Sequence, residues 1–216
     1  MADSRSIQEK YVTLFDTAKR CLLIVDQLYA DLTKQLDALA EFDAGKQDQA
    51  TVVRLFVSAH GLIDFIHRYS EVIQAMPLLS KKRAEVKSLL HICKPVSECR
   101  NYVQHIRNHL MSDETIDYPI LGSISWIKGE RDYVLFPNQA TAGHKTPGIA
   151  YDTWQKKYVC KYQLSISSYQ LKLDLIYNEV KQFWKWLSFI SHIEPAIIKE
   201  YDWGGAAIVY SQFTKE

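Results

Sequence analysis

The sequence predicts a mainly α-helical fold, a helical bundle with a small antiparallel β-sheet inserted before the last long helix. Through the first half of the chain, apolar residues recur every three or four positions, which is the spacing of amphipathic helices. Between residues 118 and 167 the pattern changes to the apolar–polar alternation typical of strands, and afterwards the helical spacing returns. We therefore expect a single domain over residues 1–216, with a β insertion at residues 118–167.

Four helices are expected before the insertion. A glycine-containing break at residues 43–46 separates the first two, and Pro77 stops the second. Pro95 separates the third from the fourth, because proline lacks an N–H donor but suits the first turn of a new helix. The expected ranges are 7–39, 52–73, 81–92 and 95–111.

The insertion is expected to be a sheet of about three strands that packs against the bundle, since so small a sheet is not stable alone. Residues 123–127 and 133–136 flank a glycine-containing turn, which indicates a hairpin. Residues 158–166 alternate as a third strand, and residues 169–192 return to the helical spacing. A short apolar run at residues 206–210 could form a further strand.

Composition narrows the class of protein. Hydrophobic residues make up 47% of the 216 positions, enough for a sizeable core, and the net charge of only +1 argues against a protein that coats nucleic acid. The segment from Lys81 to Leu110 is locally basic, which suits a focused anionic ligand. The four cysteines show no CxxC pair, so we expect neither a disulfide framework nor a zinc site. Uninterrupted apolar runs are far shorter than the ~20 residues that span a bilayer, and we expect a cytoplasmic protein without membrane contact.

The segment from Cys99 to His109 contains the residues best suited to chemistry. Arg100 can grip two phosphate oxygens with its guanidinium, and the imidazole of His105 can move the proton of an attacking hydroxyl. Asn101 can orient the histidine or donate to a phosphate oxygen. On a helix, Arg100 and His105 lie about 140° apart, so they converge more easily if two copies of the chain share a cleft.

The run from Arg100 to His105 resembles the motif of the HEPN superfamily, an arginine followed four to six residues later by a histidine, here with Asn101 in the polar position. HEPN domains are helical bundles, typically dimeric, and many are metal-independent endoribonucleases of toxin–antitoxin or antiviral systems. The resemblance implies catalytic roles for Arg100, Asn101 and His105, with no cofactor and no metal. The implied partners are RNA rather than DNA, a second copy of the chain, and an antitoxin or regulatory protein. We expect further substrate contacts from Lys94, Arg107 and His109.

Other interpretations stay open. The same three motif residues could form the solvated face of a helix, on a scaffold that binds nucleotide, RNA or protein without cleaving it. A second match to the motif runs from Arg54 to His60, but it has leucine after the arginine and lies in an apolar stretch, so we interpret it as a decoy. Asp64 or Glu71 on the second helix could face the motif and orient a histidine.

Aromatic side chains offer two more alternatives. Those near the end of the last helix are expected to pack it against the bundle. Those of the insertion could either pack the sheet or stack on RNA bases. The group on the last helix is Phe183, Trp184, Trp186 and Phe189. The group in the insertion is Trp126, Tyr133, Trp154, Tyr158 and Tyr162.

Overall fold

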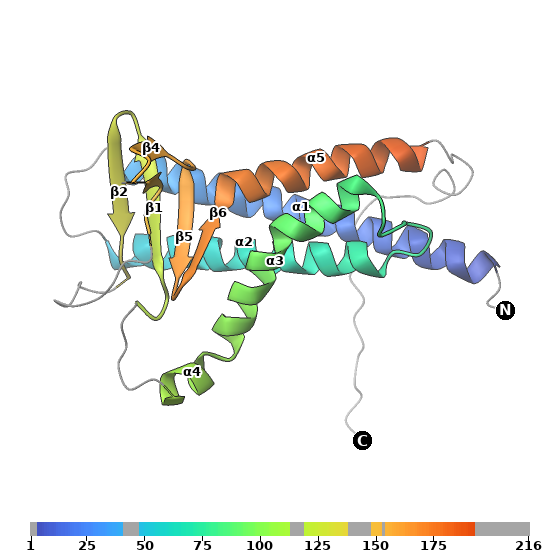
Figure 1. The fold of residues 1–216 in the computed structure, drawn as a ribbon, viewed down its shortest axis with the longest axis horizontal. Helices are drawn as coiled ribbons and strands as arrows, with labels where there is room; N and C mark the ends of the chain where they lie inside the picture. The colour runs from blue at the N-terminus through green and yellow to red at the C-terminus, as the bar shows by residue number, and fades with distance from the viewer. Residues whose placement is uncertain (1–3, 41–47, 113–118, 138–147, 153, 193–216) are drawn as a thin grey trace, which may run out of the picture.

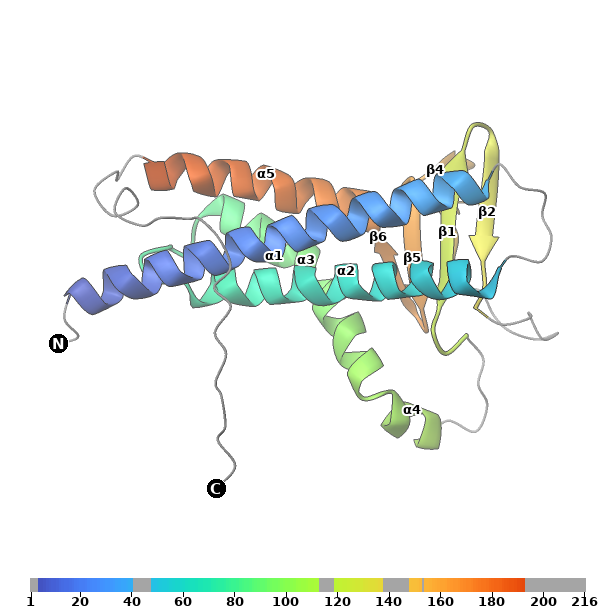
Figure 2. The ribbon, with the colours of Figure 1, turned by 180° about the vertical axis from the view of Figure 1, so that it is seen from behind.

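Two long antiparallel helices, α1 and α2, form the centre of the fold, and α5 lies along α1 on its other side (Figures 1 and 2). The computed structural model describes residues 4–40, 48–112, 119–137, 148–152 and 154–192. Within them the chain is mainly helical, with a small antiparallel sheet before the last helix, which confirms the predicted fold class. The helices are α1 (Ser4–Leu39), α2 (Gln49–Ala75), α3 (Ala84–Gln104), α4 (Ile106–Ser112) and α5 (Leu173–His192).

The contact between α1 and α2 depends on apolar stripes and one small residue. Leu32, Leu36, Leu55 and Leu62 are fully buried in the shared core. Gly61 lies beside Leu28, whose Cδ1 would be only 3.3 Å from a Cβ at that position. Burial of these side chains stabilises the pair by about 1.5–3 kcal/mol for each leucine. The apolar spacing therefore identifies both helices correctly.

Polar contacts also tie α5 to α1. The side chains of Tyr177 and Lys181 on α5 both bind the Asp26 carboxylate, at 3.0 Å and 2.6 Å. Nearer the start of α1, the hydroxyls of Tyr11 and Ser191 lie 2.7 Å apart. These contacts fix the last helix along the length of the first one.

The third helix differs from its predicted form, because α3 continues through Pro95 and ends only at Gln104. Pro95 cannot donate to the carbonyl of His91, but both residues are exposed, so water can bind that carbonyl. Buried side chains on both sides of Pro95, such as Leu89 and Cys99, hold the helix against the bundle. The predicted helix boundary at Pro95 was therefore wrong, and the break comes instead at His105.

The sheet lies at one end of the bundle (Figure 1) and is wholly antiparallel, with strand order β2-β1-β5-β6. The hairpin of β1 and β2 is confirmed, whereas the predicted third strand divides into β4 and β5. Strand β6 was not predicted, since its residues had been assigned to the last helix. A separate two-stranded hairpin is formed by β3 and β4. The strands are β1 (Ser123–Lys128), β2 (Arg131–Leu135), β3 (Tyr151–Asp152), β4 (Lys157–Tyr158), β5 (Tyr162–Ile166) and β6 (Tyr169–Lys172).

Both faces of the central strands are buried. One face carries Ile124 and Leu164, which belong to the same core as the helices. The other carries polar residues that bind one another or the backbone. Gln163 donates to the Ser165 hydroxyl at 3.0 Å, and the Ser125 hydroxyl accepts from the backbone N–H of Ala150 at 3.1 Å. The sheet is thus an integral layer of the domain.

Two predicted features, the break at residues 43–46 and the strand at residues 206–210, lie outside the described residues.

Candidate functional site

The motif from Arg100 to His105 occupies the last turn of α3. His105 is the residue that ends the helix, with φ −104° and ψ 20°, and its backbone N–H donates to the carbonyl of Asn101 at 3.1 Å. The helix α4 follows directly and turns away from the bundle (Figures 1 and 2). The side chains of Asn101 and His105 are exposed. The motif therefore lies at an exposed helix end, not in the middle of a helix as predicted.

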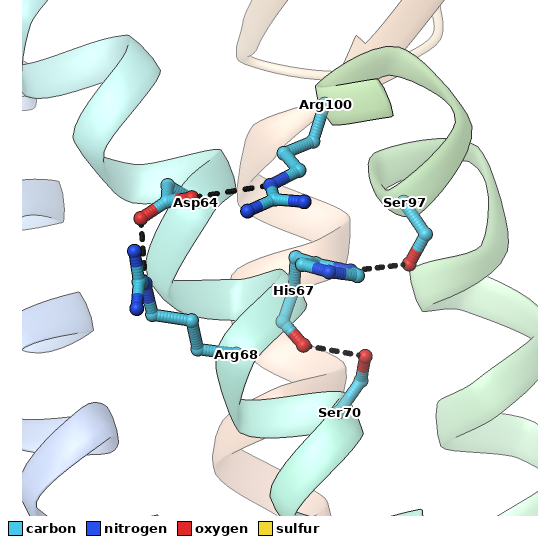
Figure 3. Close-up of polar contacts among 6 residues, drawn as sticks. All are labelled: Asp64, His67, Arg68, Ser70, Ser97 and Arg100. Carbon is cyan, nitrogen blue, oxygen red and sulfur yellow. Dashed lines mark hydrogen bonds and ion pairs between the residues drawn. The ribbon is translucent and has the colours of Figure 1, made fainter. Parts of the chain in front are cut away.

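Arg100 is the least exposed of the three motif side chains. Its side chain is 22% exposed, and its Nε donates to Oδ1 of Asp64 on α2 at 3.3 Å. The other carboxylate oxygen of Asp64 accepts from Nε of Arg68 at 2.7 Å (Figure 3). Burial of the carboxyl raises its pKa, but the hydrogen bonds and charges of the two arginines outweigh this effect and lower the pKa of Asp64. One carboxylate thus holds two arginines, so this group of three side chains carries a net positive charge.

A second polar contact joins α2 to α3 one turn away. Nδ1 of His67 lies 2.9 Å from the hydroxyl of Ser97 (Figure 3). The same hydroxyl lies 3.2 Å from the backbone carbonyl oxygen of Cys93, to which it can donate. His67 and Ser97 are three residues from Asp64 and Arg100, respectively. The two contacts together set the register of these antiparallel helices.

The structure does not bring Arg100 and His105 of one chain together. Five helical residues separate them by about 140° around the axis. Arg100 accordingly faces Asp64 on α2, while His105 faces solvent. A site that uses both side chains on one phosphate needs either a second copy of the chain or a different histidine.

The three predicted substrate-binding residues have different environments. Lys94 is exposed and lies 3.8 Å from the Glu98 carboxylate, a weak contact one turn along the same helix. Arg107 is exposed on α4. His109 stacks on the ring of Tyr102, with ring centres 4.5 Å apart, and is half-buried. Arg107 and Lys94 are therefore free to meet an anion from solvent, whereas His109 also packs α4 against α3.

The second motif match lies elsewhere and has a structural contact. Arg54 is exposed, and Nε2 of His60 lies 3.1 Å from the backbone carbonyl oxygen of Leu121. Burial lowers the pKa of His60, and the hydrogen bond to Leu121 only partly opposes that change. His60 thus connects α2 to the chain entering the sheet.

Asp64 was among the residues predicted from the sequence, whereas His67 and Arg68 were not. A signal was present in the spacing of three and four residues from Asp64 to His67 and Arg68, which places them on one side of α2. Asp64 and His67 meet α3 there, and Arg68 binds the Asp64 carboxylate. The predicted role of Asp64 needs correction, since it binds Arg100 and Arg68 rather than a histidine.

Within the described residues, no group of three or more His, Cys, Asp and Glu side chains is placed to hold a metal ion. The pair of His105 and His109 has no third ligand there.

By length and composition alone, α2 could cross a membrane. Of its most apolar stretch of 18 residues, 39% is buried inside the protein. The buried side chains of α2 pack in the core between α1 and α3, so the fold accounts for part of this apolar character.

The aromatic side chains of α5 and of the insertion include both buried and exposed residues. Phe183, Trp184 and Trp186 pack α5 on the core as expected, but Phe189 is 68% exposed. In the sheet, Trp126 and Tyr162 are buried, whereas Trp154 is 95% exposed.

No family model matches the chain, and no similar protein is found among curated proteins or solved structures. The resemblance to the HEPN superfamily therefore stays a prediction that rests on the motif and its helical setting.

Proposed function

We propose that this chain is a metal-independent endoribonuclease that acts as a homodimer. In the proposed reaction a ribose 2′-hydroxyl attacks the neighbouring phosphorus, the bond from phosphorus to the 5′-oxygen breaks, and a 2′,3′-cyclic phosphate remains. The observation that supports this function best is the placement of Arg100, which Asp64 holds at 3.3 Å beside the exposed end of α3. Asn101 and His105 are exposed at the same helix end.

Arg100 would bind the phosphate and stabilise the charge that develops on it. Its contact with Asp64 is made through Nε, so the two terminal nitrogens can meet two phosphate oxygens. Arg68 binds the same carboxylate through its own Nε and can add a second fork. A positioned arginine is worth more in catalysis than a mobile one, because less ordering is needed during the reaction.

His105 would take the proton from the 2′-hydroxyl and return one to the leaving oxygen. Because His105 and Arg100 of one chain point about 140° apart, the proposal places His105 of one protomer beside Arg100 of its partner. The exposed polar end of α3 and the absence of buried residues on α4 leave this surface open to such a symmetric contact.

A non-catalytic scaffold is the second candidate. The observation that favours it is the same Arg100–Asp64 pair, since a contact that merely joins α2 to α3 has this geometry as well. In this case the helix end would bind nucleotide, RNA or a protein partner through Asn101, His105 and Arg107 without cleaving anything.

The test is cleavage of single-stranded RNA by the purified chain in excess EDTA, with the product ends identified by mass spectrometry. His105→Ala and Arg100→Ala should each lower the rate by about 10²-fold or more, the usual scale for such groups. His91→Ala is the matched control, because His91 is also an exposed histidine of α3. Arg54→Ala and His60→Ala should affect stability alone.

Each other outcome assigns a different function or site. An unchanged rate in His105→Ala, with its melting temperature retained, would leave the scaffold as the better candidate. A loss of activity in His67→Ala without unfolding would move the proton transfer to His67. A requirement for magnesium with 5′-phosphate products would mean that other residues act. A monomer by light scattering, with and without RNA, would exclude the shared site.

A further inference from the structure

Trp154 is the most exposed large apolar side chain among the described residues, at 95%. It lies in the turn between β3 and β4, on the short hairpin of residues 151–158. A tryptophan carries a large, flat aromatic ring, on which a nucleic-acid base can stack. Trp154 has no role in the core and none in the site described above.

The turn that carries Trp154 is fixed by its own hydrogen bonds. Oδ1 of Asp152 accepts from the backbone N–H groups of Trp154 and Gln155, both at 2.9 Å. Lys156 adopts a left-handed backbone conformation with φ 51°, and the strands pair Tyr151 with Tyr158. Because these hydrogen bonds hold the backbone of Trp154 and Gln155, little further ordering of it is needed when a ligand binds the ring.

Basic and aromatic side chains follow Trp154 in the same hairpin. Lys156 and Lys157 follow Trp154 in the turn, and both are exposed. Tyr158 is 45% exposed, and its ring centre lies 5.1 Å from that of Tyr151. Beside Tyr158 is an open depression of about 440 Å³, whose lining includes both Lys161 and Asp174. Flat rings next to ammonium groups have the chemistry that binds bases and phosphates of single strands.

We propose that the described residues of this hairpin, 151, 152 and 154–158, bind single-stranded RNA, with Trp154 and Tyr158 stacking on bases and Lys156 and Lys157 binding the adjacent phosphates. This inference rests on the proposed function for its ligand, and it adds a second contact with the same substrate. The hairpin lies at the end of the sheet away from α4 (Figures 1 and 2), and the hydroxyl of Tyr158 contacts the β1–β2 turn at Glu130. It therefore contributes to substrate binding and not to the chemical step.

RNA fits this surface better than a membrane does. The described apolar surface of the turn is essentially one indole ring, and the Asp152 carboxylate lies at its base. Insertion into a bilayer interface depends on a larger buried apolar area. Stacking on a base needs only one flat face, and each stacked base adds substantial affinity.

The test uses a single-stranded 2′-O-methyl oligouridine of about twelve nucleotides, close to the site size of single-strand binders. It has no 2′-hydroxyl and cannot be cleaved, so binding is measured by fluorescence anisotropy on the wild-type chain. Trp154→Ala should weaken binding about tenfold, and Trp154→Phe should retain most of the affinity. Phe189→Ala is the matched control, because Phe189 is also a highly exposed aromatic residue, and it should bind as the wild type does.

The contribution of the lysines is measured separately, from the salt dependence of RNA binding. Replacing Lys156 and Lys157 together with glutamine should weaken binding and reduce the slope of log Kd against log salt by about 1.4. Lys10→Gln with Lys185→Gln, two exposed lysines outside both the hairpin and the basic α3 segment, should leave that slope unchanged.

Three results would overturn the inference. The first is that the wild type does not bind the oligonucleotide, and the second is that Trp154→Ala binds it as tightly as the wild type does. The third is that Trp154→Ala still binds RNA but no longer binds phosphatidylserine vesicles. Loss of cleavage is distinguishable from these results. If the wild type cleaves nothing but binds the oligonucleotide through Trp154, only the nuclease proposal fails. If it cleaves RNA and Trp154→Ala alters kcat but not KM, the hairpin inference fails.

Discussion

The two arginines that share the Asp64 carboxylate allow distance and burial to be compared as sources of stability. Arg68 makes the shorter contact, 2.7 Å, but its side chain is 56% exposed and lies four residues along the same helix. Arg100 makes the longer contact, 3.3 Å, but it is 22% exposed and joins two helices. We predict that the less exposed contact contributes more to the free energy of unfolding. Asp64 should therefore be coupled more strongly to Arg100 than to Arg68.

The expected magnitudes follow from these environments. An exposed ion pair at this helical spacing contributes about 0.3–0.5 kcal/mol, because water and salt screen the charges. A hydrogen bond to a charged group away from water contributes about 1.5–3 kcal/mol. The Asp64 side chain is 30% exposed, so the Arg100 contact should fall between these ranges, at about 1 kcal/mol. For a domain of this size, that corresponds to a change of roughly 2–4 °C in melting temperature.

The measurement is a pair of double-mutant cycles, in which Asp64→Ala is combined with Arg100→Met and separately with Arg68→Met. Methionine keeps the apolar stem of arginine, and alanine keeps the helix. Urea unfolding of each variant gives the two coupling free energies. A coupling to Arg68 equal to or larger than that to Arg100 would refute the reasoning, because contact distance would then outweigh burial.

Two further predictions concern buried titratable groups. Because burial lowers the pKa of His60 below its ordinary value of 6.5, the unfolded chain binds more protons than the folded chain near pH 6. The free energy of unfolding should therefore fall as the pH drops below about 6.5 and level off below the folded pKa, and His60→Gln should show a flatter profile between pH 7 and 5 in thermal melts. Burial also raises the pKa of Cys93, Cys99 and Cys160 to about 12, so these thiols should resist iodoacetamide at pH 8 in the native protein but react in guanidinium. Rapid native labelling of any of them, located by mass spectrometry, would contradict the described burial.

Apolar periodicity was sufficient to predict α1, α2 and most of α5, and it failed where local chemistry and tertiary contacts disagree. Pro95 should end a helix by its own chemistry, but Leu89 and Cys99 hold both sides of it in the core. Residues 169–172 also fit the helical period, and only their pairing with residues 163–166 makes them a strand. The turn between these strands has Ser167 at φ 52°, where the usual turn signal would have been glycine.

The candidate site was predictable only in part. Spacing alone placed Arg100 and His105 on different sides of a helix, and the structure agrees. What spacing cannot predict is which side chain of another helix meets Arg100, since that depends on the register between α2 and α3. The acidic residues of α2 are the natural partners for Arg100, and Asp64, which does bind it, was one of the two predicted to face the motif.

The contact between the first and last described helices has a consequence for synthesis on the ribosome. Tyr11 and Ser191 are 180 residues apart in the chain, and Asp26 meets Lys181 across 155 residues. As the chain emerges, α1 can pair with α2 early, but its other face has no cover until α5 has been made. The nascent chain therefore carries an exposed apolar stripe for most of its synthesis, at translation rates of about 5–20 residues per second. Closure of this long loop, rather than formation of the helices, should limit the rate at which the domain folds.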